Sequence, residues 1–235
     1  MKLPPLINGI IQRRYKRFLA DITLEDGREI TAHCPNTGRM TSCWAPGAPV
    51  QVSHSGNPKR KLAWTLERVD MGGGWIGVHT GRVNPIIAEA ISAGDIAELR
   101  DYPRIRREVT FNSDQHRSRI DLLLTGGESA DAWVEVKNAT LLVDDQVQFP
   151  DAVTDRGRKH LDVLAELVAQ GNRAVLVFAV NRPEGRCLSV ADQVDPAYGR
   201  RLREVVEQGV EIVAPRLIHR LQSIVVDGSV PITLS

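Results

Sequence analysis

This chain of 235 residues has few cysteines, no long apolar run and no internal repeat. Its three cysteines, Cys34, Cys43 and Cys187, are an odd number without a CxxC pair, which argues against a disulfide framework and a structural zinc site. No apolar stretch approaches the roughly 18 residues of a membrane span. The first residues show no basic and apolar segments typical of a secretory signal. We therefore expect a cytoplasmic protein with reduced thiols and no membrane partner.

Charge is nearly balanced over the whole chain but unevenly distributed along it. The net charge is +1, yet residues 1–61 contain ten Lys/Arg against four Asp/Glu, and the remainder contains twenty against twenty-five. A basic front beside an acidic remainder favours contact between the front and a polyanion. Nucleic acid is the first partner to consider.

Turn signals divide the first 80 residues into short strands. Asp26-Gly27, Pro35 to Gly38, Pro46-Gly47 and Gly72 to Gly74 separate the runs. The predicted strands are 17–24, 28–34, 48–55, 61–69 and 75–80. Five short strands without a convincing helix favour a small closed barrel of the OB type.

The pattern changes after Thr80, where we place a domain boundary, giving domains of residues 1–82 and 83–235. The spacing predicts a helix over 84–99, with Asn84 as its N-cap and Pro85 in its first turn. The later predicted elements are strands at 104–112, 118–124 and 132–139, a loop at 143–153, a helix at 154–171, a strand at 173–180, a helix at 197–208 and strands at 210–214 and 222–226. This order predicts an α/β sheet domain.

Asp121, Glu135 and Lys137 are ionised residues in two runs that otherwise read as buried strands. Such groups are costly among apolar neighbours unless they are paired or bound to a metal. Strand side chains alternate, so Glu135 and Lys137 share one face; if the strands are neighbours, Asp121 joins them, opposite Ile120 and Leu122. A surface hairpin with one Glu–Lys ion pair remains the alternative.

The order Asp121, thirteen residues, Glu135, one residue, Lys137 is the layout of a metal-dependent phosphodiesterase site. Two carboxylates held close repel each other unless a cation lies between them. Mg²⁺ or Mn²⁺ would resolve this, with Asp121, Glu135 and the Val136 carbonyl as protein ligands and Lys137 beside the attacking water. Glu89, on the preceding predicted helix, is a possible third acid or a solvated glutamate.

Two further groups of residues could hold phosphate. The predicted helix at 154–171 has Thr154 and the preceding Asp151 as candidate caps. It carries Arg156, Lys159 and His160 near its start, where a helix favours anions; a structural role for His160 stays open. The basic front adds a set with aromatic neighbours, which suits nucleic acid without sequence readout or is merely a solvated face. Its members are Arg13, Arg14, Lys16, Arg17, Asn36, Arg39, Lys59, Arg60 and Lys61.

Several longer motifs resemble one known family. RRYKRFLADI (13–22), HCPNTGRM (33–40), RSRIDLLL (117–124), VEVKNATL (134–141) and FPDAVTDRGRKHL (149–161) are similar to the sugar fermentation stimulation protein A family, in order from about residue 10 to 215. The resemblance implies an OB-fold domain followed by a PD-(D/E)xK restriction-endonuclease-like αβββαβ domain, non-specific DNA binding, and a role in regulating sugar, notably maltose, utilisation.

On the family pattern Asp121, Glu135 and Lys137 match the nuclease signature, and Glu89 falls at the position of the first-helix acid. The other matching positions are His33, Asn36, Thr37, Gly38, Asp151, Thr154, Arg156, Gly157 and His160. We therefore expect a DNA-binding protein with a Mg²⁺- or Mn²⁺-dependent nuclease site. A non-catalytic DNA-binding regulator with a relict site, an RNA-processing nuclease and a homodimer remain open.

Overall fold

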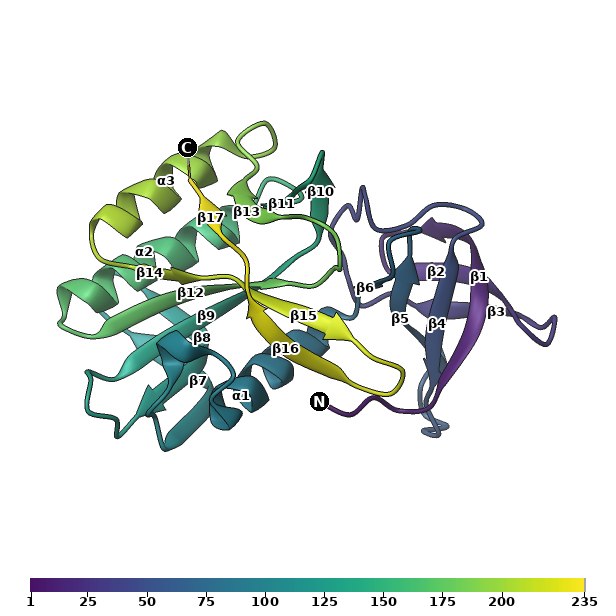
Figure 1. Cartoon of the computed structure of the whole chain (residues 1–235), viewed down its shortest axis with the longest axis horizontal. Coiled ribbons are helices and arrows are strands. Elements are labelled where there is room, and N and C mark those ends of the chain that lie inside the picture. Colours follow the sequence, from purple (N-terminus) through teal and green to yellow (C-terminus); the bar gives the residue numbers. More distant parts are fainter. Residues whose placement is uncertain (235) are drawn as a thin grey trace.

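The computed structural model describes residues 1–234 and shows a β-barrel beside a larger α/β part (Figure 1). The barrel is a closed ring, because β3 pairs with both β2 and β5 and the order β3-β2-β1-β4-β5 completes the circle. Its strands are β1 (Leu6–Tyr15), β2 (Leu19–Leu24), β3 (Glu29–His33), β4 (Pro49–His54) and β5 (Trp64–Asp70), and β6 (Trp75–Gly77) pairs with β5 outside the ring. The predicted OB-type barrel is confirmed.

One barrel strand was missed by the sequence prediction, and another was wrongly placed in the ring. β1 buries only Gly9 and Ile11 among its ten residues, so it gives a weak alternating signal. Gly9 has a steric reason, since a Cβ atom there would lie 2.7 Å from Cγ2 of Ile22. The last predicted strand, 75–80, is shortened to β6 and lies outside the closed ring.

The α/β part is built on a seven-stranded sheet of order β16-β15-β12-β9-β8-β7, with β14 beside β12. Helix α1 packs against one face, whereas α2 and α3 lie together over the other (Figure 1). The bounds are α1 (Val83–Ala93), β7 (Arg104–Asn112), β8 (Arg117–Thr125), β9 (Ala132–Ala139), α2 (Asp155–Ala169), β12 (Arg173–Val180), α3 (Pro196–Glu207), β14 (Glu211–Val213), β15 (Pro215–His219) and β16 (Ile224–Ser229). The predicted α/β domain is confirmed.

Two predictions in this part were wrong in detail. The helix expected over 84–99 ends at Ala93, because Gly94 adopts a left-handed conformation, and a separate 3₁₀ turn follows at Ala97–Leu99. The loop expected at 143–153 contains part of a hairpin. Strands β10 (Leu141–Val143) and β11 (Gln146–Phe149) form it, and with β13 (Cys187–Val190) and β17 (Ile232–Thr233) they make a second sheet.

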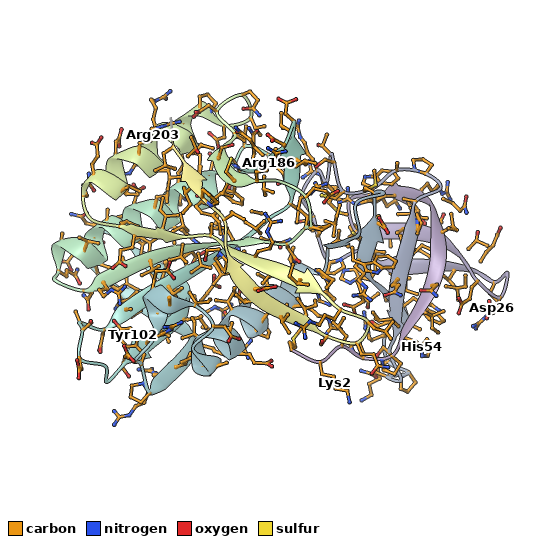
Figure 2. All side chains as sticks on the ribbon, viewed as in Figure 1. Lys2, Asp26, His54, Tyr102, Arg186 and Arg203 are labelled. Carbon is orange, nitrogen blue, oxygen red and sulfur yellow. The ribbon has the colours of Figure 1, made fainter. Side chains whose placement is uncertain are left out.

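Barrel and α/β part are joined by buried and partly buried polar contacts rather than by a linker alone. The guanidinium of Arg182, 1% exposed, donates to the carbonyl of Thr140 at 2.7 Å and to the hydroxyl of Ser42 at 3.2 Å. The Ser42 hydroxyl in turn accepts from the amide of Leu142 at 2.8 Å. Buried groups that are paired in this way hold one arrangement, because separating them would leave them unsatisfied. Asp26, by contrast, lies at the outer end of the barrel, away from the sheet (Figure 2).

Candidate active site at the junction of barrel and sheet

A pocket of about 340 Å³ is formed by residues from both parts of the molecule. The barrel side contributes Asn36, Gly38 and Thr80; the α/β part contributes α1, β8, β9 and α2. Its lining residues from the α/β part are Val83, Asn84, Asp121, Glu135, Val136, Lys137, Asn138, Thr140, Asp151, Arg156 and His160. The structure therefore brings together residues that lie up to 124 positions apart between Asn36 and His160.

Asp121 enters this pocket where strands β8 and β9 stop pairing. Their register ends at Leu122↔Val134, and beyond it the carboxylate of Asp121 accepts a hydrogen bond of 2.8 Å from the backbone amide of Val136. The side-chain alternation also slips here. Ile120 packs in the core under α2, whereas Leu122 packs in the core under α1, so the prediction that they share one apolar face was wrong.

The second oxygen of Asp121 is held by helix α1. The side-chain amide of Asn84 donates to Oδ1 of Asp121 at 2.6 Å. Asn84 is therefore not the N-cap that the sequence predicted; the helix begins one residue earlier, at Val83, and Arg82 occupies the cap position. Sequence reasoning found Asn84 but gave it the wrong role, because a cap and a carboxylate-binding amide have the same local signature.

Burial and a neighbouring charge disfavour ionisation of Asp121. Burial is the larger cause and the negative charge of Glu135 the second; together they raise the pKa of Asp121 to about 6, despite the hydrogen bonds from Val136 and Asn84. A carboxyl with such a pKa close to a second carboxylate is typical of sites that take up a cation.

Glu135 is the most enclosed charged group of the pocket, at 2% exposed. Its Oε1 accepts from the ammonium of Lys137 at 2.6 Å and also contacts Nδ1 of His160. Burial opposes ionisation, but the bond to His160 and the charge of Lys137 outweigh it and hold the pKa of Glu135 below its usual range. Glu135 is thus an ionised carboxylate at neutral pH.

The donor set fits a hard divalent cation with few protein ligands. Oε2 of Glu135 is buried and has no hydrogen-bond partner, which is costly unless a ligand satisfies it. Asp121 lies close enough to Glu135 for the negative charge of Glu135 to raise the pKa of Asp121. Among residues 1–234 no group of three His, Cys, Asp or Glu residues is arranged to hold an ion. Water would complete the shell, as Mg²⁺ permits with one or two carboxylates.

Glu89 lies outside this pocket. Its carboxylate is 60% exposed and lies 3.1 Å from the N-terminal ammonium of Met1. The reason is helical geometry: Asn84 lines the pocket, and five residues further on a side chain lies about 140° round the helix axis. We therefore drop Glu89 from the candidate metal ligands.

The barrel closes the pocket with the loop of Asn36 and Gly38. The side chain of Asn36 accepts from the amide of Gly38 at 2.9 Å, and Oδ2 of Asp151 accepts from the amide of Met40 at 3.3 Å. A Cβ atom at Gly38 would overlap the carboxylate of Asp151, so only glycine allows this approach. The loop and the α/β part therefore fit each other at this point.

Helix α2 supplies the basic side of the pocket. Thr154 is its N-cap and accepts from the amide of Gly157 at 3.0 Å, as predicted. His160 is buried, with Nδ1 3.1 Å from Nζ of Lys137, whereas Arg156 is exposed at the pocket mouth. Asp151 does not cap the helix. Asp195 accepts from the amide of Thr154 at 2.8 Å instead.

The basic residues of the barrel differ in what they can bind. Arg14 directs its guanidinium at backbone carbonyls, with Arg17, Asn36 and Gly38 within 2.9 Å, so it holds the loop and is not free for a phosphate. Arg13 pairs with Asp21 at 2.6 Å. The others on this surface are exposed: Lys16, Arg17, Arg39, Lys59, Arg60 and Lys61.

Sequence reasoning missed three further polar lining residues of this pocket, Thr80, Asn138 and Thr140. Asn138 follows Lys137 directly, and its side-chain Oδ1 accepts from the side-chain amide of Asn181 at 2.9 Å. Thr80 donates its hydroxyl to the carbonyl of Pro35 at 3.0 Å. Asn and Thr are not unusual in these stretches of sequence, so only the folded structure shows that these residues line the pocket.

Comparison with known families agrees with this arrangement. The model described as "SfsA N-terminal OB domain" matches residues 13–78, and the model "Sugar fermentation stimulation protein RE domain" matches residues 81–222. The chain belongs to the sugar fermentation stimulation protein family. Its members include a homologue in Acidithiobacillus ferrooxidans (strain ATCC 53993 / BNL-5-31), 49% identical and covering 92% of both chains, and one in Geobacter metallireducens, 48% identical over the full length of both.

A solved structure of the family has the same fold. It is described as SfsA of Pyrococcus furiosus in complex with Ca²⁺, is 26% identical in sequence, and superimposes with a TM-score of 0.89 over 99% of this chain and 98% of that one. The OB-like barrel followed by an α/β domain is thus the architecture of this family. In residues 1–234 no helix has the length and apolar character needed to cross a membrane.

Proposed function

We propose that this member of the sugar fermentation stimulation family is a metal-dependent phosphodiesterase of the PD-(D/E)xK type, cytoplasmic, that cleaves nucleic acid without reading its sequence. The observation that carries the proposal is the meeting of Asp121, Glu135 and Lys137 in one pocket, with the buried Oε2 of Glu135 left without a partner. A binding protein gains nothing from two carboxylates beside a phosphate, because they repel it.

Asp121, Glu135 and the carbonyl of Val136 would hold Mg²⁺ or Mn²⁺. The bound ion would lower the pKa of a coordinated water and neutralise charge on the phosphate. The occurrence of Ca²⁺ in the Pyrococcus furiosus relative, an oxygen-liganded cation, supports this choice of metal class. In the described residues no thiol lines the pocket, which argues against a soft metal.

Lys137 and His160 would act beside the scissile bond. The Lys137 ammonium is fixed by Glu135 at 2.6 Å, so it points at one place rather than sampling solvent. There it can orient the attacking water and stabilise developing negative charge. Arg156 at the mouth would bind a phosphate oxygen with two donors. His160 keeps Glu135 ionised and so acts as a positioning residue.

Sequence independence follows from the chemistry of the two surfaces. The pocket offers charged groups for phosphate, and the barrel offers exposed Lys and Arg with Phe18, which is 44% exposed, as a stacking surface. Contacts to phosphate and stacked bases fix position without reading base edges.

The deciding experiment is a cleavage assay with the full chain. Supercoiled plasmid, single-stranded DNA and RNA are each incubated with Mg²⁺, Mn²⁺, Ca²⁺ or EDTA. We expect cleavage that requires metal and falls at least about 100-fold in Asp121→Asn and in Glu135→Gln. Glu89→Gln is the matched control, because it neutralises an acid outside the pocket, and its rate should stay within twofold of wild type.

Three results would change the proposal. Cleavage of RNA alone would assign an RNA-processing nuclease instead. Absence of cleavage on every substrate, with binding retained in both acid variants, would assign a non-catalytic DNA-binding regulator. Equal loss in Glu89→Gln would remove the pocket as the explanation.

A further inference from the structure

A second groove adjoins the pocket and shares Arg156 and His160 with it. It has a volume of about 310 Å³ and lies between the first residues of β8 and the side of α2 around Lys159. Its lining residues are His116, Arg117, Ser118, Arg119, Arg156, Lys159, His160 and Val163. The groove therefore extends the site along the α/β part.

The lining of this groove is cationic. It holds three arginines, a lysine and two histidines, and none of its lining residues is an acid. Within residues 1–234, neither Arg117 nor Lys159 forms an ion pair with a carboxylate. Arg119 pairs with Glu108 at 2.9 Å, but both side chains are more than half exposed, so the pair is weak and exchangeable.

Among residues 1–234, the two other carboxylates that contact lining residues of this groove, Glu135 on His160 and Glu166 on His116, are already paired. Glu166 pairs with Nδ1 of His116 at 2.8 Å and accepts from the hydroxyl of Ser113 at 3.0 Å. That bond fixes the turn between β7 and β8 against α2 and so sets the width of the groove. Arg117, Arg156 and Lys159 remain as unneutralised cations along one channel, which repel one another unless an anion lies among them.

We propose that this groove binds the phosphate backbone of the nucleic acid next to the scissile phosphate, so that Arg117, Arg119 and Lys159 hold the flanking strand. The inference rests on the proposed function for the identity of the polyanion. The continuity of the two cavities through Arg156 favours a chain of phosphates over a single small anion. With no Phe, Tyr or Trp in the lining, the contacts are to the backbone and carry no base preference.

The test measures binding separately from cleavage. A fluorescein-labelled single-stranded 20-mer and the matching duplex are titrated with the full chain in EDTA, and anisotropy is followed over a series of NaCl concentrations. The variant Arg117→Gln/Arg119→Gln removes two cations that are exposed and outside the catalytic pocket. We expect at least tenfold weaker binding and a salt slope smaller by about 1.4 for the single strand, since each phosphate contact contributes about 0.7.

Arg200→Gln is the control. Arg200 is an exposed arginine on α3 that lines neither cavity, and we expect its binding and slope to match wild type. A second variant, Lys159→Gln, reports on the opposite wall of the groove and should reduce the slope by about half as much as the double variant. Unchanged melting temperatures would show that all three variants fold.

The inference fails if the double variant and Lys159→Gln bind both oligonucleotides with wild-type affinity and slope. It also fails if Arg200→Gln weakens binding equally, because the effect would then be one of net charge. If wild type cleaves no substrate but the groove variants lose binding, the groove proposal stands and the catalytic proposal is wrong. If wild type cleaves and the groove variants bind normally, the catalytic proposal stands and the groove proposal is wrong.

Discussion

The carboxylate of Asp121 accepts a hydrogen bond of 2.8 Å from the backbone amide of Val136, at the point where β8 and β9 cease to pair. This one contact replaces a strand–strand bond with a side chain–backbone bond. It puts a partly buried acid next to Glu135, whose charge raises the pKa of Asp121 further. The separation of the two strands therefore creates the site, and the repulsion between the two carboxylates destabilises the metal-free folded state.

Asp121→Asn should stabilise the metal-free protein. Burial and the charge of Glu135 raise the pKa of Asp121 to about 6, so at pH 8 its ionised form destabilises the folded state. Removing the charge should increase the free energy of unfolding by about 1–3 kcal/mol in EDTA. Urea denaturation with and without Mn²⁺ measures this, and Mn²⁺ should stabilise wild type but not the variant. A variant less stable than wild type in EDTA would contradict the predicted repulsion.

Gly38→Ala should disturb the contact between barrel and sheet. The added methyl would overlap the Asp151 carboxylate and the loop amide network, which we expect to cost about 1–3 kcal/mol in unfolding free energy. Gly56→Ala is the matched control, because a Cβ at Gly56 meets open space and should change stability by less than about 0.5 kcal/mol. Equal effects at both positions would refute the steric argument.

Arg14 and Lys16, two residues apart, should behave differently. Arg14→Gln removes donors from the carbonyls of Arg17, Asn36 and Gly38, so we expect a loss of about 2 kcal/mol in stability. Lys16→Gln changes an exposed side chain and should leave stability unchanged while reducing the salt slope of DNA binding. Thermal melts and anisotropy titrations separate the two. A melting temperature of Arg14→Gln equal to that of wild type would contradict a structural role for Arg14.

His219 should make the protein sensitive to acid. Burial, followed by the positive charge of Arg68, lowers the pKa of His219 to about 3. As pH falls below about 6.5, His219 therefore becomes protonated in the unfolded chain but stays neutral in the folded chain. The free energy of unfolding is therefore unaffected by His219 above about pH 6.5. Below that pH it decreases by about 1.4 kcal/mol per pH unit, down to about pH 3.

Denaturant midpoints at pH 7, 6 and 5 would measure that loss. In His219→Asn the slope between pH 6 and pH 5 should fall by about 1.4 kcal/mol per unit, because the titrating group is gone. His54→Asn is the control, since His54 is exposed on the end of β4. An unchanged slope in His219→Asn would show that other groups set the acid limit.

The local sequence predicted most elements because each depended on short-range chemistry. Gly27 and the Pro46-Gly47 pair predicted turns correctly, and Thr154 predicted the start of α2. The elements that failed lack such signals. β1 buries two residues of ten, and β11 gains its partner β13 from a segment about 40 residues further on, which no local pattern shows.

By itself, the sequence determined which charged residues are out of place. Asp121, Glu135 and Lys137 stood among apolar neighbours, and the cost of burying charge marked them. What only the tertiary structure decided is their arrangement. Helix phase turns Glu89 to solvent, and strand separation at Asp121 overrides simple alternation. The Asn36 loop reaches the pocket of the acids, and the Arg117 groove adjoins that pocket, only when distant segments pack together. Burial costs are local properties of residues, whereas proximity depends on the path of the whole chain.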